Sequence, residues 1–80
     1  MILNIYSIKK PVITKEIRSI NLKTKAGELT ILDHHLPLIV PMVKGLMKII
    51  DAQDVESVLD VNGGIVEVRP ENKINILIES

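Results

Sequence analysis

The stretch from Leu59 to Arg69, Leu-Asp-Val-Asn-Gly-Gly-Ile-Val-Glu-Val-Arg, decides the fold of this 80-residue chain. On both sides of its two glycines, apolar residues, most of them β-branched, recur at every second position. This alternation predicts two strands that each bury one face. Asn62-Gly63-Gly64 lies between them and tolerates positive φ, so the chain can turn or bulge there at little cost. We therefore predict that Gly63 and Gly64 are structural residues of a turn.

A second turn follows at Pro70-Glu71-Asn72, which combines three residues that are common in turns. Lys73 to Ile78 then returns as a third strand, because its isoleucines again stand at alternate positions. The sequence therefore predicts a β meander over residues 55–78, in which each strand pairs with the next one along the chain.

The N-terminal part of the chain is predicted to form further strands. Met1 to Ile8 is apolar at both odd and even positions, which predicts a short strand covered on both faces. Val12 to Lys25 is the longest β-like run, but its apolar residues change from odd to even positions at Arg18-Ser19. A β-bulge at that point would return Ile20 and Leu22 to the core face. The alternative is a simple break between two strands.

The middle of the chain favours strands over a helix. A helix from Leu36 to Ile50 is conceivable from hydrophobicity, but Pro41 in its interior would cost about 3 kcal/mol and Gly45 about 1 kcal/mol more. We therefore reject the helix and expect Pro41 to break the apolar run. The remaining elements are predicted as a turn at 24–27, a strand at 28–32, an apolar run at 38–43, a strand at 45–50 and a hairpin turn at 51–54.

Short apolar runs separated by turn residues at intervals of roughly eight to twelve positions predict an all-β fold. Two aliphatic sheets packed face to face satisfy this pattern. We therefore expect residues 1–80 to form a single domain, a small two-sheet β-sandwich of about eight to ten short strands with no significant helix. A chain of this size buries only about 60–65% of its unfolded surface, so its stability should be modest.

The composition narrows the classes of function. Ten basic and ten acidic residues give zero formal net charge, and Tyr6 is the one aromatic residue. Without a basic stripe or aromatic side chains to stack on bases, nucleic-acid binding is not expected. The longest apolar run, Leu36 to Val43, is too short to span a bilayer. The N-terminus shows no signal-peptide pattern and the chain has no cysteine, so we expect a soluble protein in a cytoplasm-like compartment.

Asp33-His34-His35 is the one cluster of residues that commonly bind metals. Neighbouring residues on a strand point to opposite faces, so at most two of the three could converge on one ion. One interpretation is a loop corner with a single structural histidine. The alternative is a free-standing metal-binding or enzymatic β-sandwich that uses all three residues. Gly63-Gly64 opens no helix and is not a phosphate loop, and we expect no catalytic residue, no metal site and no cofactor.

Two stretches resemble the epsilon subunit of ATP synthase. Gly27 to Leu32, followed by His35, Pro37 and Leu38, is similar to that family's Gly-Glu-Leu-Gly-Ile-x-Pro-Gly-His-Ala-Pro-Leu. Asn62 to Pro70, followed by Asn72 to Leu77, is similar to its Ser-Gly-Gly-x-x-Glu-Val-x-Pro-x-x-x-Val-x-Val-Leu. The spacing between the two stretches also fits, and the resemblance covers nearly the whole chain.

The resemblance implies the N-terminal β-sandwich of that family. It also implies a non-catalytic rotor subunit in the central stalk of an F-type, proton- or sodium-translocating ATP synthase. Such a subunit contacts the gamma subunit and the ring of c subunits and couples their rotation to ATP synthesis. The implied location is the cytoplasmic face of the bacterial inner membrane, as a peripheral part of the complex with no membrane span of its own.

The same resemblance assigns candidate interface residues. It places the turn at Gly27-Glu28 toward the polar loops of the c ring, and it places a second set of residues beside gamma. Asp33-His34 stands where the family has Pro-Gly. The sequence ends at Ser80, and we expect it to lack the two C-terminal helices of the family. The second set, which the resemblance places beside gamma, consists of His35, Leu36, Pro37, Leu38 and Val40.

Overall fold

A computed structural model describes residues 1–79 of the chain, and Ser80 lies outside the described part. Its strands are β1 (Ile2–Tyr6), β2 (Ile13–Thr24), β3 (Gly27–Leu32), β4 (Leu38–Met42), β5 (Gly45–Asp51), β6 (Glu56–Val61), β7 (Gly64–Arg69) and β8 (Lys73–Ile78). Within residues 1–79 there is no helix, and hence none that could cross a membrane. The prediction of an all-β fold and the rejection of a helix over residues 36–50 are confirmed.

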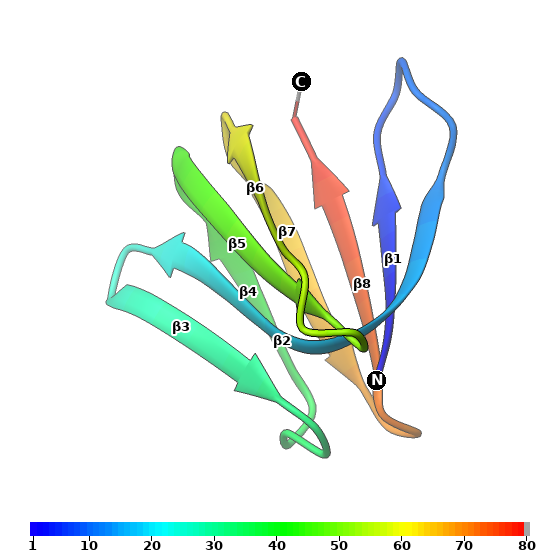
Figure 1. The fold of residues 1–80 in the computed structure, drawn as a ribbon. Coiled ribbons are helices and arrows are strands. Elements are labelled where there is room, and N and C mark those ends of the chain that lie inside the picture. Colours follow the sequence, from blue (N-terminus) through cyan, green and yellow to red (C-terminus); the bar gives the residue numbers. More distant parts are fainter. Residues whose placement is uncertain (80) are drawn as a thin grey trace.

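The long strand β2 carries the chain from one layer of the fold to the other (Figure 1). One layer runs in the order β4-β7-β8-β1 and ends on the first half of β2. The other layer contains the second half of β2, with β3 on one side and β5 followed by β6 on the other. β1 and β8 are parallel, whereas the remaining pairs are antiparallel. The predicted two-sheet sandwich is therefore confirmed, with β2 shared by both sheets.

A β-bulge separates the two halves of β2, at the place where the sequence predicted one. The partners of β2 in β5 shift between Ile17 and Ser19, so Arg18 is the extra residue. Ile17 and Ile20 are both almost completely buried, at 2% and 0% exposed. In a regular strand these two positions would point to opposite faces, so the bulge is what allows both to enter the core.

The core between the two layers is aliphatic, and all eight strands contribute to it. Burying a leucine, isoleucine or valine side chain contributes about 1.5–3 kcal/mol, so this burial is the main force that holds the layers together. The largest fully buried side chains are Leu3, Ile17, Ile20, Leu22, Ile31, Met47, Val66, Ile74 and Ile76.

The predicted meander over residues 55–78 is only partly right. β7 and β8 form the expected antiparallel hairpin through Pro70-Glu71-Asn72. β6, however, pairs with β5, while β7 pairs with β4 and β8. The Asn62-Gly63 connection therefore crosses from one layer to the other and does not close a hairpin. Alternation identified the strands correctly, but it does not specify which strands become neighbours.

Two further strand predictions need correction. β4 continues through Pro41, where the sequence predicted a break, and Pro41 lies opposite Ile65 of β7. β4 lies at the end of the strand order, and an edge strand tolerates proline because one side of its backbone needs no partner. The strand predicted over Met1 to Ile8 was expected to be covered on both faces. The observed β1 ends at Tyr6, and Tyr6 is 39% exposed, so one face of β1 is open to solvent at that end.

Candidate functional site

The β2–β3 hairpin presents Gly27 and Glu28, here called the hairpin patch, to solvent. Thr24 closes the turn, because its hydroxyl donates to the Gly27 carbonyl oxygen at 2.9 Å and accepts from the Ala26 N–H at 3.2 Å. Gly27 has a φ of 117°, a conformation that residues with a side chain rarely adopt. The turn therefore fixes Glu28 at the exposed beginning of β3.

Glu28 is paired with a lysine on the neighbouring strand. It lies opposite Lys23 of β2, and its Oε1 accepts a hydrogen bond from Lys23 Nζ at 2.8 Å. This hydrogen bond and the charge of Lys23 lower the pKa of the Glu28 carboxyl group. The Glu28 side chain is 64% exposed, so the pair is screened by solvent and contributes little to stability. Glu28 thus presents a stable carboxylate on the surface.

The second candidate set, here called the corner patch, consists of His35, Leu36, Pro37, Leu38 and Val40. Leu38 and Val40 are half-buried and pack against the core. Leu36 is 80% exposed, and Ile39, which points away from the core between Leu38 and Val40, is 71% exposed. His35 is half-buried, and its Nδ1 lies 2.8 Å from the Leu36 carbonyl oxygen. Leu38 and Val40 therefore attach this segment to the core, and Leu36 and Ile39 form its exposed apolar surface.

The corner patch follows a tight turn from Leu32 to His35. The His35 N–H donates to the Leu32 carbonyl oxygen at 3.3 Å. His34 has a φ of 61°, whereas the φ of Asp33 is negative. A negative φ followed by a positive one is the pattern of a type II turn, which favours glycine at its second central position. Asp33-His34 therefore forms the kind of turn that the Pro-Gly pair of the similar family motif would favour.

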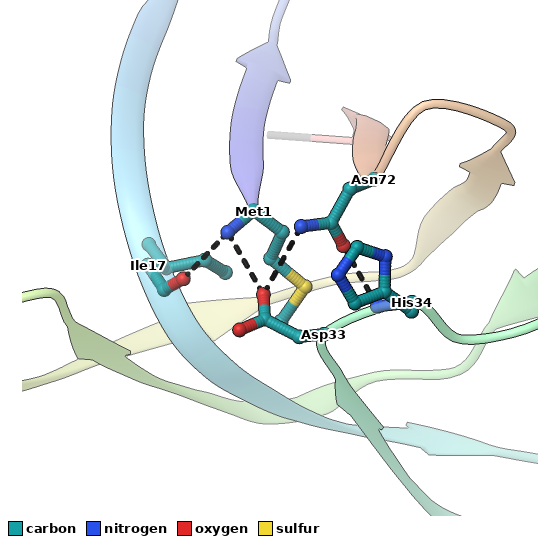
Figure 2. A network of polar contacts seen from close by, with 5 residues as sticks. All are labelled: Met1, Ile17, Asp33, His34 and Asn72. Atoms are coloured by element: carbon teal, nitrogen blue, oxygen red, sulfur yellow. Dashed lines mark hydrogen bonds and ion pairs between the residues drawn. The ribbon is translucent and has the colours of Figure 1, made fainter.

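Side chains from separate segments meet at this corner (Figure 2). Asn72, in the β7–β8 turn, accepts the His34 N–H on Oδ1 at 2.8 Å and donates from Nδ2 to Asp33 Oδ1 at 3.2 Å. The same Asp33 oxygen accepts from the Met1 ammonium group at 3.0 Å, and this group also donates to the Ile17 carbonyl oxygen at 3.1 Å. The ammonium group and Asn72 lower the pKa of the Asp33 carboxyl group. We call the contacts among Asp33, His34 and Asn72 the corner clasp.

A shallow hollow brings parts of the two patches together. Glu28 of the hairpin patch lines the same hollow as Leu38 and Val40 of the corner patch, although the resemblance assigns them to different partners. The other end of β3 leads to His35, which is outside this hollow. The hollow has a volume of about 280 Å³ and is lined by Thr24, Ala26, Glu28, Leu29, Leu38, Ile39 and Val40.

The metal-binding alternative for Asp33, His34 and His35 is not supported. Asp33 Oδ1 is occupied by the Met1 ammonium group and by Asn72, while His35 Nδ1 lies against a backbone carbonyl oxygen. In the part of the chain that the structure describes, no group of three or more histidine, aspartate or glutamate side chains is placed to hold a metal ion. The three residues therefore form a turn and do not converge on a common centre.

Gly63 and Gly64 lie where the chain passes from β6 to β7, with φ values of 132° and 150°. A Cβ atom on Gly64 would stand 2.1 Å from the Leu77 carbonyl oxygen, which is far inside van der Waals contact. A Cβ atom on Gly63 would stand 3.3 Å from the Met42 carbonyl oxygen. Gly64 is paired with Ile78, so β8 cannot move away without losing that pairing. Both space and φ therefore require glycine at position 64.

Residues 1–80 match the protein family described as "ATP synthase, Delta/Epsilon chain, beta-sandwich domain". The chain belongs to this family. The match includes the hairpin patch, the corner patch and the Gly63-Gly64 connection. The expectation of an epsilon-type β-sandwich is thereby confirmed.

Curated relatives and solved structures agree with this membership in the Delta/Epsilon family. The ATP synthase epsilon chain of Priestia megaterium is 36% identical over 70 residues, which are 88% of this chain and 51% of the relative. The chain spans about half the length of the curated relatives that it matches.

Two structures of mitochondrial ATP synthases contain a similar fold. A chain of the Euglena gracilis enzyme, in a structure of OSCP, F1 and the c-ring, superposes with a TM-score of 0.89 and 19% identity, covering 98% of this chain and 49% of that one. A chain of the Tetrahymena thermophila central stalk and c-ring superposes with a TM-score of 0.85 and 20% identity, covering 100% of this chain and 63% of that one. These likenesses show that the family fold is kept.

Sequence reasoning missed two residues of this Delta/Epsilon domain that shape the corner patch. Ile39 was not among the candidates, although its place between Leu38 and Val40 signals an outward side chain once those two are assigned to the core. Asn72 was recognised only as a turn residue. Its bonds to Asp33 and His34 span 39 and 38 positions of the sequence, and no local pattern signals such contacts.

Proposed function

We propose that this chain is a non-catalytic rotor subunit in the central stalk of an F-type, proton- or sodium-translocating ATP synthase. The observation that carries the proposal is the family match over residues 1–80. The role is one of binding and holding: the subunit joins its partners into one rotating body and thereby couples rotation to ATP synthesis, with no chemical step of its own.

In this proposal the partners are the gamma subunit and the ring of c subunits. The subunit lies at the cytoplasmic face of the bacterial inner membrane, as a peripheral part of the complex. Support for this placement comes from a bacterial relative named ATP synthase epsilon chain and from the similar fold in a structure of a central stalk with its c-ring.

The fold suits a part that must transmit force. Hydrogen bonding connects all eight strands through β2, and every strand contributes side chains to one aliphatic core. Protein interiors are packed as densely as organic crystals and are poorly compressible, so strain applied at one surface is transmitted to another. A rigid body with two binding surfaces is what a coupling subunit requires.

The hairpin patch offers its partner a fixed negative charge. Glu28 is ionised at neutral pH, as an exposed glutamate ordinarily is, and Lys23 lowers the pKa of its carboxyl group further. We propose that Gly27 and Glu28 contact the polar loops of the c ring, where a cationic group could take the place of Lys23. Charge pairs at the rim of an interface mainly set specificity and the rate of association. This contact would therefore help to fix the position of the subunit on the c ring more than it would raise the affinity.

The corner patch offers an apolar surface. Leu36 and Ile39 are large side chains that are mostly exposed, and Leu38 and Val40 anchor the segment that carries them. Burial of apolar surface contributes roughly 25 cal/mol per Å², and a few buried anchors commonly supply most of the binding energy of an interface. We propose that His35, Leu36, Pro37, Leu38 and Val40, together with Ile39, form the contact with gamma.

Binding to a catalytic complex that retains gamma but lacks its epsilon subunit tests this function. The parent chain should bind with a stoichiometry of one in a calorimetric titration. Leu36→Asp should weaken binding at least about tenfold, because it removes an apolar anchor from the interface. Val58→Asp is the matched control: Val58 is 49% exposed on β6, at the opposite end of the strand order from β4, and its replacement should leave binding unchanged. Absence of binding by the parent, or equal loss in both variants, would contradict the proposal.

A further inference from the structure

The corner that precedes the corner patch holds a conformation that its own residues disfavour. His34 has a φ of 61°, in the left-handed region, which is less favourable than the ordinary regions for a residue with a side chain. Only three residues separate His34 from the beginning of β4 at Leu38. A change in the backbone at His34 would therefore redirect Leu36, which is 80% exposed.

Asn72 stabilises this conformation from a different part of the chain. Its Oδ1 accepts the His34 N–H at 2.8 Å, and its Nδ2 donates to Asp33 Oδ1 at 3.2 Å (Figure 2). Asn72 is itself fixed, because its carbonyl oxygen accepts the N–H of Ile2 at 3.1 Å. The side chain thus binds the corner through both ends of its amide group, while the backbone of Asn72 is bonded to the start of β1.

The β7–β8 hairpin holds both ends of the loop that carries His35, Leu36 and Pro37. At the far end, Leu38 of β4 lies opposite Val68 of β7 in a regular antiparallel pairing. At the near end, Asn72 in the turn of the same hairpin binds His34. Because one rigid element fixes both ends, the loop has little freedom to change direction while the corner clasp is intact.

We propose that Asn72 is a positioning residue for the corner patch: its side-chain amide fixes the His34 turn and thereby orients Leu36 for its partner. The inference rests on the proposed function, since it concerns how the gamma-binding surface is held. An interface loop that is ordered before binding loses less conformational entropy when the complex forms. Removing the clasp should therefore weaken binding, although Asn72 itself need not touch gamma.

A matched pair of variants separates this role from the backbone requirement of the β7–β8 turn. Asn72 and Glu71 have φ values of 61° and 72°, so both positions favour glycine equally by conformation. Asn72→Gly removes the amide that holds the corner, whereas Glu71→Gly removes an exposed side chain and leaves the clasp in place. Any difference between the two variants reports the clasp, because both gain the same backbone freedom.

Amide hydrogen exchange on the isolated chain measures the positioning directly. In Asn72→Gly the His34 amide should exchange at least about tenfold faster than in Glu71→Gly, because it loses its acceptor. The His35 amide, which donates to the Leu32 carbonyl oxygen across the same turn, should also exchange faster. Amides of the core strand β8 should exchange alike in both variants. If the His34 and His35 amides exchange at the same rates in the two variants, or if β8 is accelerated as much as His34, the positioning role is refuted.

Titration against the epsilon-depleted complex supplies the functional readout. Asn72→Gly should bind at least about fivefold more weakly than the parent, while Glu71→Gly should bind as the parent does. If the parent fails to bind, the proposed function fails, whereas the exchange measurement still decides whether Asn72 orders the corner. If the parent and Asn72→Gly bind with equal affinity while exchange shows a loosened corner, the proposed function stands and the positioning inference is overturned.

Discussion

The Gly63-Gly64 connection and the Asp33-His34 corner both need a backbone with positive φ, and they obtain it by different means. At the connection the residues are glycines, and the Leu77 carbonyl oxygen leaves no room for a Cβ atom on Gly64. At the corner the residue at a φ of 61° is a histidine, bound by Asn72 from 38 positions away in the sequence. The first conformation is specified at its own position, whereas the second is specified by a distant side chain.

This difference follows from what surrounds each site. The connection joins two layers at a point where β7 and β8 are paired, so the neighbouring backbone excludes any side chain. The corner is at the surface, where space is available and a polar network can compensate for an unfavourable φ. We therefore expect the connection to tolerate almost no substitution and the corner to respond to changes in several residues.

The largest effect is expected at Gly64. Gly64→Ala should lower the free energy of unfolding by about 2–4 kcal/mol, because it combines backbone strain with a clash against the Leu77 carbonyl oxygen. Gly63→Ala should cost less, about 1–2 kcal/mol, since its nearest neighbours would be at 3.3 Å. Chemical denaturation of both variants measures the difference. Equal stability of Gly64→Ala and the parent would show that the connection does not depend on glycine.

A smaller effect is expected on acidification, and it should involve the corner but not the glycine connection. The pKa of Asp33 is lowered in the folded chain by the Met1 ammonium group and then by Asn72. Because the pKa of this carboxyl group is lower in the folded chain, the unfolded chain binds more protons at acidic pH. The stabilisation is therefore complete above about pH 5 and is lost as the pH falls through the folded pKa. Chemical denaturation at pH 7, 5 and 3 should show a lower free energy of unfolding at pH 3 than at pH 5.

Two amide variants identify the source of that acid sensitivity. Asp51 also has a lowered pKa, because it accepts the N–H groups of Val55 and Gln53 and lies near Lys15. Asp33→Asn and Asp51→Asn should each lose less stability than the parent between pH 5 and pH 3. If Asp33→Asn shows the same pH dependence as the parent, the charge of Asp33 does not stabilise the corner.

A still smaller effect, of opposite sign, is expected at the corner itself. His34→Gly should raise the free energy of unfolding by about 0.5 kcal/mol, because relief of the left-handed strain exceeds the added freedom of the unfolded chain. The clasp is kept, since Asn72 binds the backbone N–H of residue 34. A thermal melt measures the change. Strong destabilisation would mean that the imidazole has a structural role that the turn geometry does not explain.

The smallest effects are expected in the two patches. Glu28→Ala and His35→Ala should leave the melting temperature of the isolated chain within about 3 °C of the parent, as is typical of surface substitutions. Each should instead weaken assembly, Glu28→Ala toward the c ring and His35→Ala toward gamma. A large fall in the melting temperature for either variant would assign that residue to the fold and remove it from the proposed interface.

Most of the fold could be predicted from the sequence because its signals are local. Alternation of apolar residues located the strands, and the parity change at Arg18-Ser19 located the bulge, since each signal lies within a few positions. The pairing of β6 with β5, and not with β7, could not be predicted in this way. This pairing depends on how the two layers pack. A glycine-rich connection is compatible both with a hairpin and with a crossing between layers, so its sequence does not distinguish the two.

The candidate site was predictable to a smaller extent. The structure places the residues that the family resemblance nominated on the surface or at its margin. They are Gly27, Glu28, His35, Leu36, Pro37, Leu38 and Val40. The resemblance could not reveal that Leu38 and Val40 pack against the core while Ile39 is exposed. The bonds from Asn72 to the corner join distant parts of the chain, and only the folded arrangement brings them within hydrogen-bond distance.

The most direct test of the central claim is to identify what each patch touches in the assembled enzyme. Two variants of the chain, Glu28→p-benzoylphenylalanine and Leu36→p-benzoylphenylalanine, are incorporated separately into the epsilon-depleted enzyme with its c ring and irradiated, and the cross-linked subunits are identified by mass spectrometry. We predict that position 28 labels a c subunit and that position 36 labels gamma. Labelling of one and the same subunit from both positions, or of neither c nor gamma, would contradict a rotor subunit that bridges the two.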